Sequence, residues 1–399
     1  MNHIYTLTST LATAQLENVR VLLRADLNVP LKNDKIASDF RLQAFRPTLD
    51  LLIQKKACIL LVTHIGQPTD QDPHLSTKLL LPWFNKQKYS ISYAETIEKA
   101  AQLFAPAHIV LLENIRFWAE EKAETQTLAQ ALRAITDVFV QDAFGALHRS
   151  DTTIAQLPLL YPEEHRTIGL LVEQELAALN TILVKPKKPV FAFIGGAKIA
   201  TKLPLIHNLM TIADTIALLP PLSLTFAHAK NQPVGKSLID QTFNNVVRIT
   251  LNNARKNNKR ILLPLDYLVS RNGWHEPYET IAANAFEPDQ MGITIGPKTQ
   301  KLYQQESGQA KTIIFNGPSG DLAYPKTCTA MRKLFAFWCP SSAYRLVAGA
   351  DSIAFLQQFK LQACVNYCSS GGGASITYLS GKKLPGLEPF VTKNTRQIL

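Results

Sequence analysis

Short runs of apolar residues recur along the chain and constrain its fold more than any other sequence feature. In the first half these runs are VRVLLRADLN, ACILLVTHIG, HIVLLENIRF and DVFVQDAFG. The segments between them have helical periodicity, as in residues 46–56, where Leu49, Leu52 and Ile53 fall on one face. Strands that are apolar on both faces and alternate with helices are typical of a parallel sheet covered by helices. The pattern therefore predicts an α/β domain with a doubly wound sheet.

The same pattern starts again after residue 185. Further strand-like runs follow there: PVFAFIGGAK, DTIALLPP, RILLPLDYLVS, TIIFNGPSG, YRLVAGADS and ACVNYCSSGGG. The segment 168–184 separates the two sets and places apolar residues on one helical face: Ile168, Leu171, Val172, Leu176, Leu179 and Leu183. A chain of 399 residues exceeds one typical domain, so we expect two α/β domains joined by this helix.

The charge balance favours an anionic partner. Lys and Arg number 42 against 31 Asp and Glu, a surplus of 11. Phosphorylated metabolites, nucleotides and nucleic acid all fit such a surplus. The densest basic cluster is KPKKP at 185–189, and no basic run is interleaved with aromatic residues. Nucleic acid is therefore the weaker interpretation.

The cysteines and the apolar segments indicate a cytoplasmic protein. Five cysteines lack paired zinc-ligand spacing, and Cys364 and Cys368 lie in or near a predicted strand, so we expect buried thiols in a reducing compartment. The first residues show no signal-peptide pattern, and no apolar run reaches the roughly 18 residues of a membrane helix. We expect no membrane partner.

Polar side chains collect where the first set of predicted strands ends. Arg24, Asp26 and Asn28 occupy alternate positions of VLLRADLNVP, so their side chains would share one face. Further candidates at this edge are Arg41, His64, Arg116 and Arg149. Ligands of doubly wound sheets bind at the carboxyl ends of the strands, and arginine donates paired hydrogen bonds to phosphate and carboxylate. The group predicts a cationic pocket, although each arginine taken alone also fits a solvated surface position.

The second set of strands ends in glycine-containing loops, which predicts a different kind of anion site. The loops are GGAK (195–198), NGPSG (316–320), AGADS (348–352) and GGGAS (371–375). Glycine lets backbone amides approach a ligand closely. Lys198 and Lys202 would share a helical face beside them, and Asp351 fits either a magnesium ligand or a helix cap. VGKS at 234–237 is not a P-loop, because Lys230 stands where that motif needs glycine.

These two sites predict a kinase that joins a nucleotide to an anionic small molecule. The motifs, in their order along the chain, resemble the phosphoglycerate kinase family across nearly its whole length. They are VLLRADLNVP, SDFRLQA, THIGQP, LLENIRF, QDAFGALHRSDTT, FIGGAKIATKL, VGKSLID, ILLPLD, MGITIGPKT, FNGPSG, AGADS and SSGGGASITYLSGKKLPGL. No single motif has to carry the resemblance.

The resemblance implies two Rossmann-like, doubly wound parallel-sheet domains facing a cleft. The boundaries would be 1–167 for the phosphoglycerate-binding domain, 168–184 for the connecting helix, 185–377 for the nucleotide-binding domain and 378–399 for a segment returning to the first domain. The implied reaction is reversible phosphoryl transfer between 1,3-bisphosphoglycerate and ADP, giving 3-phosphoglycerate and ATP in glycolysis or gluconeogenesis. A cytoplasmic monomer is also implied.

The resemblance assigns roles to individual residues. Phosphoglycerate would be bound by Asp26, Asn28, Arg41, His64, Arg116 and Arg149. The nucleotide would be bound by Lys202, Gly296, Asn316, Gly349, Ala350, Asp351 and Ser352, with Gly371, Gly372 and Gly373 as a phosphate loop. Asp351 would hold Mg²⁺, and Arg41, Lys198 and Lys202 would be catalytic. No protein nucleophile is needed, because catalysis becomes positioning and charge stabilisation of the moving phosphoryl group.

The sequence departs from the family pattern mainly where adenosine would bind. Leu219, Pro220 and Pro221 replace three glycines, and Ala323 replaces a ribose-binding glutamate. Gln67 replaces an arginine of the substrate pocket, AGADS replaces a run with three glycines, and Pro204 lies in a helix-forming stretch. Two hypotheses therefore stay open: an active phosphoglycerate kinase, and a catalytically impaired relative that binds an anionic ligand or a protein partner.

Overall fold

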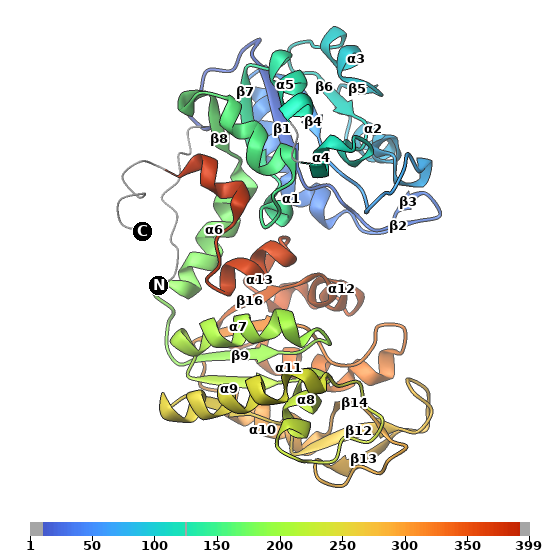
Figure 1. The fold of residues 1–399 in the computed structure, drawn as a ribbon, viewed down its shortest axis with the longest axis vertical. Coiled ribbons are helices and arrows are strands. Elements are labelled where there is room, and N and C mark those ends of the chain that lie inside the picture. The colour runs from blue at the N-terminus through green and yellow to red at the C-terminus, as the bar shows by residue number, and fades with distance from the viewer. Residues whose placement is uncertain (1–10, 124–125, 392–399) are drawn as a thin grey trace. The chain divides into compact units, whose positions relative to one another are not determined.

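The computed structural model describes residues 11–123 and 126–391, which divide into two compact units (Figure 1). The N-terminal unit contains the described residues up to Ala177 and those from Lys383 onward, and the C-terminal unit is Ala178–Lys382. Helix α6 (Leu170–Leu183) contains the boundary. Its predicted apolar residues from Leu171 to Leu183 are buried, whereas Ile168 lies in the preceding strand.

The N-terminal unit is built on a six-stranded parallel sheet in the order β5-β6-β4-β1-β7-β8. Its strands are β1 (Arg20–Ala25), β4 (Cys58–Val62), β5 (Ile91–Ala94), β6 (Ile109–Leu112), β7 (Val138–Asp142) and β8 (Arg166–Ile168). Its helices are α1 (Phe40–Gln54), α2 (Leu81–Lys86), α3 (Ile97–Gln102), α4 (Glu120–Ala123) and α5 (Gln126–Ala134), and β2 (Leu31–Lys32) and β3 (Lys35–Ile36) form a hairpin. The apolar runs predicted β1, β4, β6 and β7, but β5 and β8 at the sheet edges were missed because they are short and contain polar, half-buried residues.

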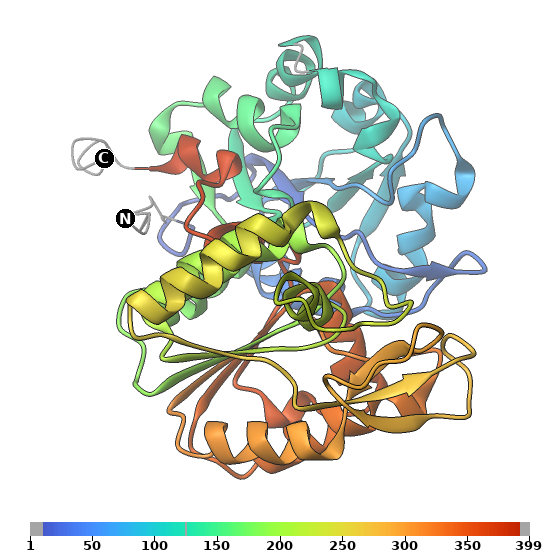
Figure 2. The same ribbon diagram turned by 60° about the horizontal axis from the view of Figure 1, so that its bottom comes forward.

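The C-terminal unit contains a second six-stranded parallel sheet in the order β11-β10-β9-β15-β16-β17. Its strands are β9 (Val190–Ile194), β10 (Thr215–Leu218), β11 (Arg260–Leu262), β15 (Thr312–Asn316), β16 (Tyr344–Ala348) and β17 (Tyr367–Ser369). Its helices are α7 (Ile199–Ile212), α8 (Leu222–Ala229), α9 (Asn244–Lys256), α10 (Pro297–Ser307), α11 (Thr329–Trp338), α12 (Ala350–Gln358) and α13 (Gly373–Leu379). Figure 2 shows α9, in yellow, along one side of these strands and orange helices along the other. The predicted pair of α/β domains is thereby confirmed.

The run RILLPLDYLVS does not form one strand, as the apolar pattern suggested. It divides at Pro264 into β11 of the parallel sheet and β12 (Asp266–Ser270). Strand β12 instead pairs antiparallel with β13 (Glu279–Ala282) and β14 (Met291–Ile295) in a separate three-stranded sheet. Proline has no amide hydrogen to continue a ladder, which explains the division.

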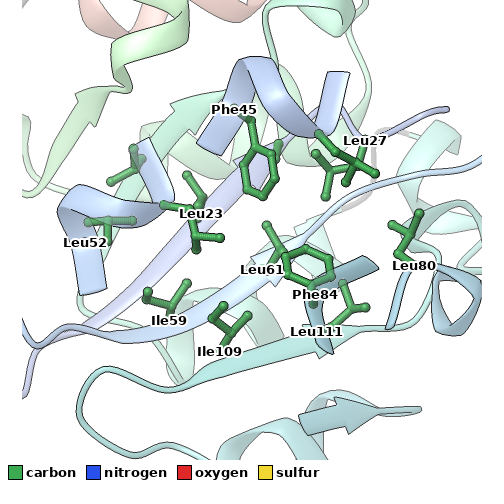
Figure 3. Packing of buried hydrophobic residues seen from close by; sticks show 14 of the residues in the cluster. Leu23, Leu27, Phe45, Leu52, Ile59, Leu61, Leu80, Phe84, Ile109 and Leu111 are labelled. Carbon is green, nitrogen blue, oxygen red and sulfur yellow. The ribbon is translucent and has the colours of Figure 1, made fainter. Parts of the chain in front are cut away.

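Aliphatic side chains make up most of the core of the N-terminal unit, and the core of the C-terminal unit contains a cluster of aromatic rings. In the N-terminal unit, Leu23, Leu61 and Leu111 from adjacent strands pack against Phe45 and Phe84 (Figure 3). In the C-terminal unit the rings cluster around Phe193, whose centroid lies 4.5 Å from that of Trp338 and 5.8 Å from that of Tyr303. Because the central strands are buried on both faces, a polar group inside them needs a hydrogen-bond partner.

The predicted returning segment rejoins the N-terminal unit from Lys383 and packs there through a short 3-10 segment, Pro385–Phe390, and its residues 392–399 lie outside the described part of the chain. The Gly386 amide donates to the Leu147 carbonyl over 3.0 Å, and the Phe390 ring stacks on Phe139. Among the described residues no helix is both long and apolar enough to cross a membrane.

The prediction of buried free thiols is wrong for Cys364, which forms a disulfide with Cys339. Cys58 and Cys328 are buried and free, and Cys368 is half-buried. The pairing could not be foreseen, because the 25-residue separation says nothing about the 4.4 Å that separates the two Cα atoms in the fold. The cysteines therefore no longer support a reducing compartment.

Truncation of Phe193 should destabilise the C-terminal unit strongly. Phe193 is fully buried in the aromatic cluster, so Phe193→Ala should lower the free energy of unfolding by about 3–5 kcal/mol, measured by urea denaturation. Phe337→Ala is the matched control, because Phe337 is 42% exposed on α11 and its loss should cost less than about 0.5 kcal/mol. Equal effects of the two variants would contradict this account of the core.

Candidate functional site

The N-terminal unit places Asp26 beside Arg41, as the sequence predicted for one shared pocket. Asp26 follows β1 and Arg41 lies in the first turn of α1. Nη1 of Arg41 contacts both carboxylate oxygens of Asp26 at 2.6 Å. Gly145 passes so close to this pair that any added side chain would collide with Asp26. Burial by itself would raise the pKa of Asp26, but Arg41 and Arg24 lower it below its usual value.

A second group of contacts joins Asn28, Gly66 and Arg116. Oδ1 of Asn28 accepts a hydrogen bond from the Gly66 amide over 2.9 Å, and Nη1 of Arg116 donates to the Gly66 carbonyl over 2.6 Å. Asn28, Gly66 and Arg116 follow three neighbouring strands, β1, β4 and β6. The loop after β4 is therefore held from both sides by residues that the sequence assigned to the substrate.

Arg116 and Arg149 meet at the carboxylate of Asp151. Oδ2 of Asp151 lies 3.4 Å from Nη2 of Arg116 and 3.3 Å from Nε of Arg149. Burial and the neighbouring charge of Arg149 both lower the pKa of Arg116, and its Nε is buried without a hydrogen-bond partner among the described residues. The predicted convergence of the two arginines is present, but a carboxylate not singled out in the sequence lies between them.

Arg24 is buried beside the pocket residues rather than open to a ligand. Its side chain is fully buried, with Nε donating to Thr153 Oγ1 over 2.8 Å and Nη1 to the Ala25 carbonyl over 2.6 Å. Glu121, also fully buried, lies 3.7 Å from its Nη2. Nη2 also lies 3.5 Å from Nδ1 of His64. Arg24 therefore supports the pocket from beneath through Thr153 and His64.

His64 is buried at the end of β4, among arginines. Burial lowers its pKa well below the usual value, and Arg24 and Arg116 add to this effect while Asp26 opposes it. The imidazole is therefore neutral near pH 7 and can serve as a hydrogen-bonding group rather than as a cation. The site thus has less positive charge than its sequence suggested.

In the C-terminal unit, Lys202 reaches Asn316 at the end of β15. Its Nζ donates to Oδ1 of Asn316, and Nδ2 of Asn316 donates to the Ala348 carbonyl over 2.6 Å. Burial lowers the pKa of Lys202 to about 8, which Asp351 partly opposes. A buried ammonium group with one neutral partner retains capacity to bind an anion.

Glycine backbone lies close to Lys202 and to its partner Asn316. An added Cβ at Gly196 would lie 3.1 Å from Cε of Lys202, and one at Gly349 would lie 2.7 Å from Nδ2 of Asn316. Gly349 has φ +100°, a conformation that favours glycine. Ser352 Oγ accepts a hydrogen bond from the Gly317 amide over 2.9 Å, so the loops after β15 and β16 are joined.

The remaining predicted nucleotide residues lie in different surroundings. Ala350 and Asp351 are exposed at the start of α12, and Lys198 is exposed at the residue that precedes α7, so Lys198 and Lys202 do not share an environment. Gly296 follows β14 and packs directly against Asp266. The loop Gly371–Gly373 leads into α13, with the Gly371 amide bonded to Ser369 Oγ.

The substitutions near the expected adenosine site change its packing. Leu219 is fully buried and its amide donates to the Ile194 carbonyl over 2.9 Å, so its side chain occupies interior space after β10. Pro220 is buried beside it, and Ala323 is exposed with its amide bonded to Asp321. Gln67 is exposed. Pro204 lies beyond the first turn of α7, which nevertheless continues to Ile212.

Glu121 and Asp151 help to build the site and were not singled out in the sequence, and Asp142 was noted only as a polar residue at a strand end. Glu121 stands in a charged run that resembles a solvated helix face, and only the fold buries it against Arg24. Asp142 ends β7, where its Oδ1 accepts hydrogen bonds from the amides of Leu171 and Val172 at the start of α6. Asp151 lies two residues after Arg149, and that closeness was the available signal.

The chain was compared with known proteins by sequence and by structure. Residues 11–382 match the family model described as phosphoglycerate kinase. The phosphoglycerate kinase of Dictyoglomus turgidum is 34% identical over 380 residues, covering 93% of this chain and 95% of the relative. That of Bdellovibrio bacteriovorus is 33% identical over 384 residues, covering 94% of each. The solved phosphoglycerate kinase of Coxiella burnetii aligns with a TM-score of 0.84 and 29% identity, over 96% of this chain and 98% of that one.

Asp142 should make the stability of the N-terminal unit depend on pH. Burial raises its pKa to about 7, so the folded chain holds the proton more tightly than the unfolded chain. The resulting stabilisation is present below about pH 4 and is lost as the pH rises toward 7, on the order of a few kcal/mol. Thermal melting across this range should show the decline in the wild type and its loss in Asp142→Asn. Asp137→Asn is the control. A hydrogen bond from Arg20 lowers the pKa of Asp137, so the stability that Asp137 contributes is lost as the pH falls rather than as it rises. Identical melting profiles for the two variants would refute the role of Asp142.

Proposed function

The chain belongs to the phosphoglycerate kinase family, and we propose that it transfers a phosphoryl group reversibly between 1,3-bisphosphoglycerate and ADP, giving 3-phosphoglycerate and ATP. It is a phosphotransferase with a carboxyl group as acceptor. The observation that carries the proposal is the buried Lys202, which has one neutral side-chain partner and lies among glycine backbone at the end of a parallel sheet.

We assign phosphoglycerate to the N-terminal unit. Arg116, Arg149 and Arg41 supply charge for its phosphate and carboxylate, and Asp26 and Asn28 supply acceptors and donors for its hydroxyl group. Neutral His64 offers one hydrogen bond without adding charge. Buried contacts hold most of these side chains in place before substrate binds, which lowers the reorganisation required at the moment of reaction.

We assign the nucleotide phosphates to the surroundings of Lys202, Asn316 and Gly349. The ammonium group of Lys202 would stabilise the negative charge that develops on the phosphoryl group during transfer. The glycine residues let backbone amides approach the phosphate oxygens closely. Leu219 and Ala323 weaken the expected recognition of adenosine rather than of phosphate, which favours lowered nucleotide affinity.

Magnesium fits this site as an ion that arrives with the nucleotide. Asp351 is exposed at the first turn of α12 and close enough to Lys202 to influence its pKa. Within the described ranges no three or more His, Cys, Asp or Glu side chains gather as a metal site. Mg²⁺ commonly binds one or two carboxylates together with substrate phosphates, so Asp351 would hold it. Bound there, the ion would neutralise phosphate charge. We further propose a cytoplasmic monomer that acts without nucleic-acid or membrane partners.

Loss of Lys202 should lower turnover strongly without changing substrate binding in the other unit. A coupled assay with 3-phosphoglycerate, ATP and Mg²⁺ should show kcat reduced by about 10²–10³ in Lys202→Ala. Calorimetry should show unchanged 3-phosphoglycerate affinity for Lys202→Ala, and unchanged ATP affinity for Arg41→Ala. Lys301→Ala, on the exposed face of α10, is the control and should match the wild type.

The same assay separates the active enzyme from the impaired relative. Wild-type turnover no greater than that of Lys202→Ala, together with undetectable ATP and ADP binding, would favour the relative, in which buried Leu219 fills the adenosine site.

The pH profile should report the ionisation of Lys202. Burial places its pKa at about 8, so the charged form that binds phosphate is lost as the pH rises through that value. The kcat/KM for ATP should therefore fall above about pH 8. Lys202→Arg carries a guanidinium that stays charged, so its residual activity should not decline there. A decline at the same pH in both proteins would assign the ionisation to another group.

A further inference from the structure

We propose that Asp151 sets the affinity for the anionic substrate, because its carboxylate is a built-in counter-ion to Arg116 and Arg149. This inference rests on the proposed function, which assigns both arginines to phosphoglycerate. It adds a specificity-determining residue whose negative charge works against binding. The structural basis is a carboxylate held between two guanidinium groups at the end of the parallel sheet.

The contacts of Asp151 are loose compared with the neighbouring ion pair. A single oxygen, Oδ2, lies 3.4 Å from Arg116 and 3.3 Å from Arg149. By contrast, both oxygens of Asp26 lie 2.6 Å from Nη1 of Arg41. Long contacts through one oxygen are weak and exchange readily for a better acceptor, such as a phosphate oxygen that two guanidinium groups can share.

The side chain of Asp151 does not cap the turn that follows it. It precedes the π-helical turn Thr152–Gln156, but its side chain makes no capping hydrogen bond there. Its backbone carbonyl, which any residue provides, accepts from the amides of Ile154 and Ala155. The side chain is only 12% exposed, so its charge is felt by the arginines with limited screening by solvent.

Asp151 strongly reduces the positive charge that the pocket offers to an anionic ligand. Arg24 is paired with Glu121 and Arg41 with Asp26, while burial keeps His64 neutral. Arg41 therefore brings a charge that Asp26 already balances, whereas Arg116 and Arg149 share a single carboxylate, Asp151, which cancels one of their two charges. A phosphate that approaches the pair must displace the carboxylate or bear its repulsion, and either effect weakens binding.

Removal of the charge should tighten substrate binding. By isothermal titration calorimetry with 3-phosphoglycerate, Asp151→Asn should have a Kd roughly tenfold below that of the wild type at low ionic strength. This difference in Kd between Asp151→Asn and the wild type should shrink with added salt, because salt screens the interaction between the charges of the pocket and the anionic ligand. The KM for 3-phosphoglycerate should fall by a similar factor, with a smaller change in kcat.

Two further variants make the test specific. Asp151→Glu restores the charge and should bind like the wild type. Asp137→Asn removes a carboxylate from a different arginine pair in the same unit, that with Arg20, and should leave the Kd unchanged. Thermal melting checks that all three variants are folded. Unchanged or weaker binding by folded Asp151→Asn would overturn the proposal and make Asp151 a positioning residue for the arginines.

The outcomes also separate this inference from the proposed function. Tighter binding by Asp151→Asn in a protein without turnover would support the counter-ion and reject the kinase. If neither the wild type nor Asp151→Asn binds 3-phosphoglycerate, both proposals fail. Turnover in the wild type with identical KM values for the wild type and Asp151→Asn would reject the counter-ion alone.

Discussion

Burial of the parallel strands on both faces is the constraint on which the rest of the structure depends. In β4, β6, β9 and β15 every residue is buried. A side chain inside such a strand cannot be polar without a buried partner, because desolvation would cost more than the fold can supply. Most polar side chains of the candidate sites therefore lie at the carboxyl ends of the strands. The loops after β1, β4, β6 and β7 supply them in the N-terminal unit, and the loops after β9, β15 and β16 supply them in the C-terminal unit.

Arg24, a charged side chain buried within β1, shows the same constraint at work. This guanidinium is fully buried, and it is accommodated because Thr153, the Ala25 carbonyl and Glu121 surround it. The network links β1 to the segment after Arg149 and reaches His64. Such a network fixes the geometry of the pocket, so its arginines need little rearrangement when an anion binds.

The two units handle anions in physically different ways. The N-terminal unit uses guanidinium groups whose charge is largely balanced by Asp26, Glu121 and Asp151. The C-terminal unit uses one buried ammonium group, Lys202, among glycine backbone. The first arrangement favours positioning of a polyanion with moderate affinity. The second favours stabilisation of the charge on a group that is being transferred.

The sequence by itself determined the fold class, the two repeated α/β patterns and the residue types at the strand ends, because strand burial and periodicity are local properties of the chain. The residues Asp26, Arg41, Arg116, Arg149, Lys202 and Asn316 could be singled out in this way, and the structure brings them into two groups. Tertiary structure alone decided which charged side chains pair with one another. The burial of Glu121 beneath Arg24, the disulfide of Cys339 and Cys364, the separate β12–β14 sheet and the position of Asp151 between two arginines all depend on contacts between distant segments. Spacing along a chain cannot reveal such contacts, because electrostatic energy depends on distance in space and on the solvent excluded from it.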